Sequence, residues 1–99
     1  INADAVAGEI AVALNAERLI FLTDVEGVLD SSQSLIKTLS ADDAQHLITS
    51  GTAGGGMIPK LEACIRALST VSKAYIVDGR QERALINAID NNPTGTELR

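Results

Sequence analysis

Two short apolar stretches, far apart in the chain, constrain the fold more than any other feature of the sequence. Residues 18–23 (RLIFLT) and 74–78 (AYIVD) are continuously apolar rather than alternating, which is typical of strands that are covered on both faces. Between them, apolar residues recur three and four positions apart, which predicts amphipathic helices. Strands that alternate with helices form parallel pairs joined by right-handed crossovers. The sequence therefore predicts one α/β domain.

The remaining elements follow from apolar spacing and from residues that start or stop a helix. We expect helices over residues 5–14, between Ser40 and Gly51, from Pro59 through Leu68, and over residues 81–89. Ser40 and Asp43 have the spacing of a capping box. Residues 31–34 are expected to turn and 35–37 to form a short strand, while 96–99 form either a final edge strand or a frayed end.

The composition favours a globular protein and argues against several classes of partner. With 45% apolar and 21% charged residues, the chain is ordinary for a folded domain. A net charge of −5, one Tyr, one Phe and no Trp provide neither a basic patch nor stacking rings for nucleic acid. No apolar run approaches the ~20 residues of a membrane span. Cys64 has no partner for an internal disulfide, so we expect a reducing, cytoplasmic location. One Cys and one His make a zinc site improbable.

Residues 51–60 (GTAGGGMIPK) are the strongest sign of a ligand. Pro59 suits the first position of a helix, so Lys60 falls in the first turn, where the helix dipole favours anions. A cation at that place suggests a bound anion, and glycines 54–56 can take positive φ and approach a phosphate closely. The same residues also suit a flexible surface loop with a solvated lysine. They do not match the P-loop pattern.

Two further polar clusters lie where ligands are commonly bound. Residues 24–30 (DVEGVLD) follow the first buried strand, at the carboxyl edge where open α/β sheets bind ligands; a simple tight turn around Gly27 is the alternative. Asn2 and Asp4 precede the first predicted helix and could instead cap it. Phosphoryl transfer depends mainly on positioning and charge stabilisation. Lys60 could stabilise the developing charge, and a nearby aspartate could orient that lysine.

Taken together, the three clusters resemble the amino-acid kinase family. The blocks NAD (residues 2–4), LTDVEGVLD (22–30) and GGMIPK (55–60) stand in the order found in that family, and the resemblance covers essentially all 99 residues. Within the family, the chain is most similar to the acetylglutamate kinases. These enzymes use ATP to phosphorylate the side-chain carboxylate of N-acetyl-L-glutamate in arginine biosynthesis. The middle block is shared with aspartokinases and glutamate 5-kinases.

The resemblance implies a three-layer α/β/α fold with a mainly parallel sheet. Residues 1–99 would be the C-terminal, ATP-binding lobe of a larger kinase whose N-terminal acyl-substrate lobe is absent from this chain. Lys60 would stabilise the transition state, and Asp4 would organise the catalytic lysines. The nucleotide would be bound by Asp24, Val25, Glu26, Gly27, Val28, Leu29, Thr52, Ala53 and Gly54. Magnesium would be carried mainly by the nucleotide phosphates rather than by protein ligands.

The expected partners are ATP and N-acetyl-L-glutamate, the second bound mainly by the absent lobe. We expect the full-length enzyme to be a homo-oligomer and the isolated chain to be inactive. Because the acceptor is chosen by the absent lobe, an aminoadipate-type kinase or a glutamate 5-kinase fits the same residues. A non-catalytic nucleotide-binding module is an alternative of a different class, against which Asp4 and Lys60 argue. Control by arginine is left open.

Overall fold

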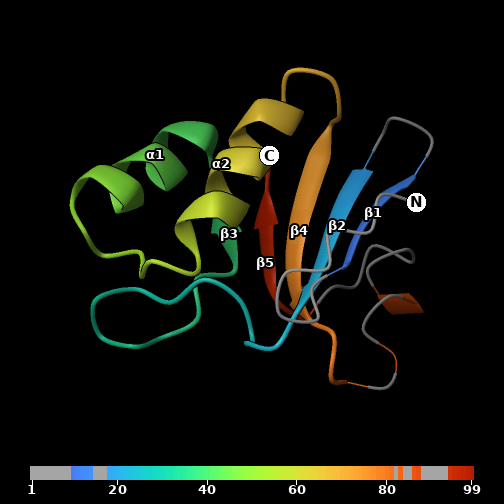
Figure 1. Cartoon of the computed structure of the whole chain (residues 1–99), viewed down its shortest axis with the longest axis horizontal. Coiled ribbons are helices and arrows are strands. Elements are labelled where there is room, and N and C mark those ends of the chain that lie inside the picture. The colour runs from blue at the N-terminus through green and yellow to red at the C-terminus, as the bar shows by residue number, and fades with distance from the viewer. Residues whose placement is uncertain (1–9, 15–17, 82, 84–85, 88–93) are drawn as a thin grey trace.

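A computed structural model of the chain describes residues 10–14, 18–81, 83, 86–87 and 94–99. In this part of the chain, five strands form one open sheet, and two helices pack against one of its faces (Figure 1). The elements are, in chain order, β1 (Ile10–Leu14), β2 (Arg18–Thr23), β3 (Thr38–Leu39), α1 (Ala41–Thr49), α2 (Ile58–Ala67), β4 (Lys73–Asp78) and β5 (Thr96–Leu98). The predicted α/β class is confirmed.

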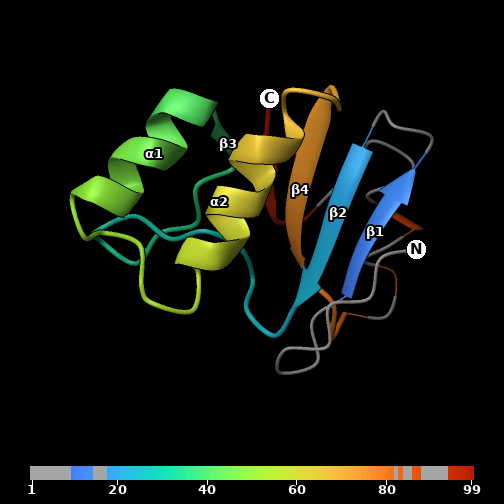
Figure 2. The same ribbon diagram turned by 45° about the horizontal axis from the view of Figure 1, so that its top comes forward.

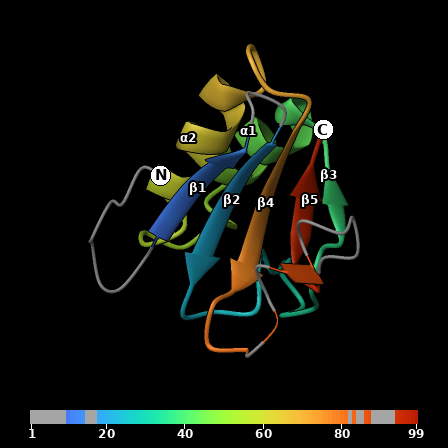
Figure 3. The same cartoon turned by 90° about the vertical axis from the view of Figure 1, so that its right-hand side faces the viewer.

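The sheet has the strand order β1-β2-β4-β5-β3 (Figure 3). The two apolar strands β2 and β4 are parallel neighbours, with Arg18 opposite Lys73 and Thr23 opposite Asp78. Strand β5 runs antiparallel to β4, and β3 runs parallel to β5. The carboxyl ends of β2 and β4 therefore lie at the same edge of the sheet as the amino end of β5.

Strands β2 and β4 are the buried centre of the sheet, as their continuous hydrophobicity predicts. Side chains of a strand point alternately to its two faces, and here each face has a cluster of its own. Ile20, Tyr75 and Val77 are at most 1% exposed and pack together with Leu22. The larger cluster lies on the face that carries the helices. Buried side chains therefore lie on both faces of the sheet, and both helices of the described part pack on the face with the larger cluster.

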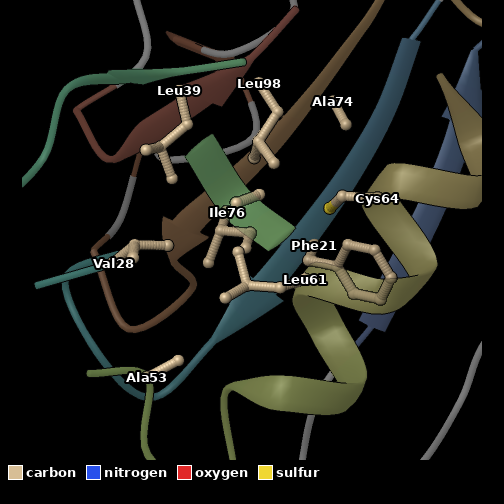
Figure 4. Close-up of a cluster of buried hydrophobic side chains, with 10 residues drawn as sticks. Phe21, Val28, Leu39, Ala53, Leu61, Cys64, Ala74, Ile76 and Leu98 are labelled. Atoms are coloured by element: carbon tan, nitrogen blue, oxygen red, sulfur yellow. The ribbon is translucent and has the colours of Figure 1, made fainter. Parts of the chain in front are cut away.

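The larger cluster joins the helices to the sheet (Figure 4). Helix α2 contributes Leu61 and Cys64, both fully buried, against Phe21 of β2 and Ile76 of β4. Burial raises the pKa of the Cys64 thiol from 9.0 to about 12. The thiol is therefore neutral at physiological pH and acts as a small core residue, as its place in the helical repeat predicts. Figure 2 shows the two helices side by side, with α2 next to β4 and β2 and with α1 next to α2 and β3.

Both helices begin close to where the sequence predicts. Ser40 Oγ accepts a hydrogen bond of 3.0 Å from Asp43 N at the start of α1, and the chain leaves that helix through Gly51 at φ +79°. Helix α2 begins at Ile58, so Pro59 is its second residue rather than its first. Lys60 still falls in the first turn. None of the helices within the described ranges has the length and hydropathy needed to cross a bilayer.

The helix predicted over residues 5–14 is wrong for residues 10–14, which form strand β1. This strand pairs with β2 in the antiparallel sense, Ile10 opposite Leu22 and Leu14 opposite Arg18. The edge of β2 offers unpaired backbone groups, and β-branched residues such as Val12 suit a strand. These tertiary and local preferences outweigh the helical spacing, which continues into residues 5–9 outside the described part.

At the other end of the chain, Thr96–Leu98 is a strand and not a frayed end. It lies inside the sheet between β4 and β3 rather than at an edge. Glu97 N donates a hydrogen bond of 2.9 Å to Lys37 O, and Arg99 N donates one of 3.0 Å to Leu39 O. Of the helix predicted over residues 81–89, Ile86 and Asn87 are helical, and most of the rest lies outside the described residues.

Candidate functional site

The turn that follows β2 begins at the surface and ends in the core. The Thr23 hydroxyl donates to Val25 O over 3.0 Å and accepts from Val25 N over 3.1 Å, so the chain turns as soon as the strand ends. Asp24, Val25 and Glu26 are exposed. Gly27 and Val28, by contrast, are buried. The turn stands at the carboxyl edge of the parallel pair β2 and β4, where the sequence predicts a ligand.

The buried half of this turn is anchored by Thr96, at the start of β5. Thr96 Oγ1 accepts a hydrogen bond of 2.9 Å from Val28 N and donates one of 2.6 Å to Ile36 O. Gly27 has φ +150°, and a Cβ there would lie 2.9 Å from Thr96 Oγ1, so only glycine fits. Sequence reasoning missed Thr96, because a contact between residues 68 positions apart leaves no local pattern.

Residues 30–34 form the polar turn that the sequence predicts. Asp30 Oδ1 accepts hydrogen bonds from Ser32 N at 2.8 Å and Ser34 N at 3.0 Å. Gln33 takes a positive φ of 65°, a conformation common at the last residue of a three-residue hairpin loop. The flanking residues Leu29 and Leu35 pair through an isolated antiparallel bridge. The segment from Val28 to Ile36 is thus a small hairpin.

The glycine-rich loop before α2 has a different construction from the one expected. Met57 N donates a hydrogen bond of 3.0 Å to Gly54 O, and Ala53 N donates one of 3.0 Å to Leu47 O of α1. Glycines 54–56 can take positive φ but do not use that freedom, since the described glycines with positive φ are Gly27 and Gly51. A Cβ on any of these three glycines would meet nothing within 4 Å. They therefore leave open space rather than permit an unusual backbone.

The turn and the glycine loop enclose one cavity of about 290 Å³. From the turn it is lined by the predicted residues Val25, Gly27, Val28 and Leu29, and from the glycine loop by Thr52, Ala53 and Gly54. Asp24 and Glu26 do not line it. Asp30, Gln33 and Met57 do, although none of the three was predicted to bind the nucleotide. Val28 and Ala53 also belong to the larger core cluster and lie toward one end of it (Figure 4).

Lys60 is buried beside the glycine loop. Its side chain emerges from the first turn of α2, and Lys60 Nζ donates a hydrogen bond of 3.0 Å to Gly56 O. Lys60 is only 7% exposed, so it is not the solvated surface lysine of the alternative interpretation. Asp4, its predicted partner, lies outside the described residues. Lys60 does not line the cavity itself but contacts the loop that does.

An ion pair at the end of β4 is a feature of this edge that sequence reasoning missed. Arg80 Nε and Nη2 each lie 2.9 Å from one carboxylate oxygen of Asp78. These side-chain hydrogen bonds lower the pKa of Asp78 and raise that of Arg80, and the charge of Asp24 adds a smaller contribution to Arg80. Gly79 N donates to Thr23 O over 2.7 Å. The signal available in the sequence was the charged pair Asp78 and Arg80 at the end of a buried strand.

Among the described residues, no three His, Cys, Asp or Glu side chains gather closely enough to hold a metal ion. His46 is an exposed residue of α1, and Cys64 is buried on the inner face of α2.

Comparison with known proteins places the chain in a family. The sequence model of the amino acid kinase family matches residues 1–78, and the chain belongs to this family. The fold agrees with that assignment. An N-acetylglutamate synthase from Neisseria gonorrhoeae, solved with coenzyme A and N-acetyl-glutamate, has a TM-score of 0.74 at 27% identity, over 83% of this chain and 19% of the synthase chain.

Several curated acetylglutamate kinases are similar to this chain, which confirms the resemblance that the motifs predict. That of Dehalococcoides mccartyi is 51% identical over 98 residues, covering 99% of this chain and 36% of its own. That of Bradyrhizobium diazoefficiens is 52% identical over 98 residues, covering 97% and 33%. That of Nautilia profundicola is 46% identical over 101 residues, covering 100% and 36%. The chain spans about a third of the length of these relatives.

Proposed function

We propose that this chain is the ATP-binding part of an acetylglutamate kinase, which phosphorylates the side-chain carboxylate of N-acetyl-L-glutamate in arginine biosynthesis. One observation carries the proposal. The turn after β2 and the glycine loop, far apart in the sequence, enclose one cavity at the carboxyl edge of two parallel strands. In open α/β sheets this edge is the usual place for a nucleotide. The names of the relatives supply the reaction and the acceptor.

The cavity suits the base of a nucleotide better than the whole molecule. Its volume of about 290 Å³ is at the lower end of the range for small-molecule sites. Val28 and Met57 offer apolar surface to the faces of a purine, while the side chains of Gln33 and Thr52 can reach its polar edge or the ribose. The phosphates would then extend along the open glycine loop toward the first turn of α2.

At that helix start, Lys60 would stabilise the negative charge of the reacting phosphates. The first turn of α2 contains no acidic residue, and its N–H groups and dipole also favour an anion. On binding ATP, the ammonium group would exchange its bond to Gly56 O for one to a phosphate oxygen. The acceptor carboxylate attacks the γ-phosphorus in line, the bond to the β–γ bridging oxygen breaks, and ADP leaves. Asp4 would orient Lys60.

The donor groups of the site fit a magnesium ion carried by the nucleotide. Asp30 Oδ1, on a residue that lines the cavity, already accepts two backbone N–H groups. Mg²⁺ usually keeps several waters and is shared with substrate phosphates, and it would neutralise part of their charge. We place N-acetyl-L-glutamate mainly on the other lobe of a cytoplasmic, homo-oligomeric enzyme. The isolated chain would bind Mg-ATP weakly and phosphorylate nothing.

An acceptor assay on the full-length protein tests this function. The protein is incubated with Mg-ATP and, in parallel, with N-acetyl-L-glutamate, L-glutamate and an N-blocked aminoadipate, and the acyl phosphate is trapped with hydroxylamine. We expect trapped product with N-acetyl-L-glutamate. A preference for another acid would change the acceptor but keep the ATP site. If calorimetry detects no binding of Mg-ATP at millimolar concentration, the proposal is contradicted altogether.

A further inference from the structure

We propose that Thr96 is a positioning residue for nucleotide binding, because its buried hydroxyl sets the place of the turn that lines the cavity. Thr96 would not touch the nucleotide. It would act through Val28, a residue that lines the cavity and whose backbone N–H donates a hydrogen bond to the Thr96 hydroxyl. That the ligand is ATP rests on the proposed function, whereas the role of Thr96 in positioning the turn rests on the geometry alone.

The Thr96 hydroxyl bridges both sides of the small hairpin. It accepts from Val28 N at 2.9 Å on one side and donates to Ile36 O at 2.6 Å on the other. Ile36 N closes the pair by donating to Val28 O over 2.8 Å. Thr96 is fully buried, and Val28 is 1% exposed. The hairpin is therefore fixed to the interior of the sheet by a side chain with both of its hydrogen-bonding roles in use.

The neighbouring backbone leaves no room for the turn to shift inward. A Cβ on Gly95 would overlap Ile76 O and would lie 3.1 Å from Glu26 O, so this glycine is the residue that lets β5 pass under the turn. On the other side, a Cβ on Gly27 would lie 2.9 Å from Thr96 Oγ1 and 3.2 Å from Thr96 N. The Gly95–Thr96 pair and the turn thus pack together without space between them. Strand β5 therefore sets how closely the turn approaches the sheet.

Removing the hydroxyl would leave a buried N–H and a buried C=O without their partner. A buried polar group that has lost its partner is costly, and the turn can relieve that cost by moving outward to water. Such a movement displaces Val28 and Leu29 from the cavity wall. The expected consequence is weaker ATP binding, with no direct effect on the acceptor, which the proposed function assigns to another part of the enzyme.

The test compares three variants in the full-length protein. Thr96→Val keeps the shape but loses the hydroxyl, Thr96→Ser keeps the hydroxyl, and Leu98→Val alters an equally buried residue of the same strand that has no bond to the turn. We expect Thr96→Val to raise the Kd for Mg-ATP about tenfold, as expected for a lost buried hydrogen bond, with the KM for the acceptor unchanged. Thr96→Ser and Leu98→Val should stay within about twofold of the wild type in Kd.

An unchanged Kd in Thr96→Val would overturn the proposal, and so would an equal rise in Leu98→Val, which would indicate a general loss of stability. Should Thr96→Val fail to fold, hydrogen exchange in the wild type decides instead. The Val28 amide must exchange far more slowly than the exposed amides of the same turn, and equal rates would overturn the proposal. If the wild type binds no ATP, the proposed function fails by itself, and faster exchange of Val28 in Thr96→Val would still support the positioning role.

Discussion

The turn after β2 and the glycine loop before α2 line the same cavity but are held in different ways. The turn is tied to the sheet by the Thr96 hydroxyl, and Gly27 sits where any Cβ would collide. The glycine loop is held by backbone bonds such as Met57 N to Gly54 O, and the space around its glycines is open. The turn after β2 is thus the fixed wall of the cavity, because packing holds it in place. The glycine loop is the open wall, because the space beside its glycines is empty.

This difference matches the two parts of a nucleotide. A base needs a wall of defined shape, because its recognition depends on close apolar contact and a few polar groups. A triphosphate needs backbone that can approach it, positive charge and space for its metal ion and water. We therefore expect changes in the fixed wall to affect stability and nucleotide affinity together. Changes in the open wall should affect catalysis with little cost in stability.

The largest effect is expected next to the open wall, from Lys60→Ala in the full-length enzyme. Loss of a group that stabilises transition-state charge lowers kcat by about 10²-fold or more. The matched control is Lys73→Ala, which removes a lysine that pairs with Glu97 at 3.4 Å on the sheet and should leave kcat within about twofold. Steady-state kinetics at saturating ATP measures both. A near-normal kcat in Lys60→Ala would remove this lysine from the mechanism.

The next prediction compares a glycine from each wall. Gly27→Ala forces a Cβ against Leu35 Cδ1 at 2.8 Å and Thr96 Oγ1 at 2.9 Å, at φ +150°, and should lower the free energy of unfolding by about 2 kcal/mol. Gly55→Ala meets nothing within 4 Å and should change it by less than about 0.5 kcal/mol. Urea denaturation measures both values. Equal losses would show that the two walls are equally constrained.

A smaller effect concerns the core behind the open wall, where Cys64 packs α2 onto the sheet. Its pKa is raised from 9.0 to about 12 by burial, so the folded protein holds the thiol proton more tightly than the unfolded chain does. The associated stability is complete below pH 9 and is lost as the pH rises from 9 to 12. The loss is about 1.4 kcal/mol by pH 10. Urea denaturation at pH 8 and pH 10 should show this difference in the wild type, and Cys64→Ala should lack it. If the wild type and Cys64→Ala lose the same unfolding free energy between pH 8 and pH 10, the thiol is not shielded from water in the core.

The smallest effect is expected next to the fixed wall, from the Asp78–Arg80 ion pair. Arg80 lowers the pKa of Asp78 below its ordinary 3.8, so the pair stabilises the fold above that pH and the contribution disappears as the pH falls through the lowered value. Arg80 is 65% exposed, which makes this contribution small. Thermal unfolding between pH 2.5 and 6 should show a slightly flatter acid profile in Arg80→Gln than in the wild type. If the thermal stability of Arg80→Gln falls more steeply with decreasing pH than that of the wild type, the ion pair does not stabilise the folded protein.

The sequence predicted the centre of the fold because its signals there are local. Continuous hydrophobicity identified β2 and β4, a cap at Ser40 identified the start of α1, and helical spacing identified the buried face of α2 with Cys64. The family blocks also named most residues that line the cavity. In each case, the determining residues are neighbours along the chain, so a pattern in the sequence is enough.

What the sequence did not predict depends on contacts between distant segments. The strand at residues 10–14 forms because β2 has a free edge. The spacing of apolar residues within 5–14 carries no information about that edge. Thr96 supports a turn 68 positions away, and Asp78 and Arg80 face a turn that begins at Thr23. Glycines 54–56 permit positive φ, but the structure uses their lack of side chains instead. Topology decides all of these points.

The central claim is that the fixed and the open wall together bind one ATP molecule. The most direct measurement is a crystal structure of the full-length protein with a non-hydrolysable ATP analogue and magnesium. We predict the adenine ring between Val28 on one side and Ala53 or Met57 on the other, with the phosphates directed to Lys60. An analogue bound elsewhere, or one whose base leaves the cavity between these two walls empty, would contradict the account.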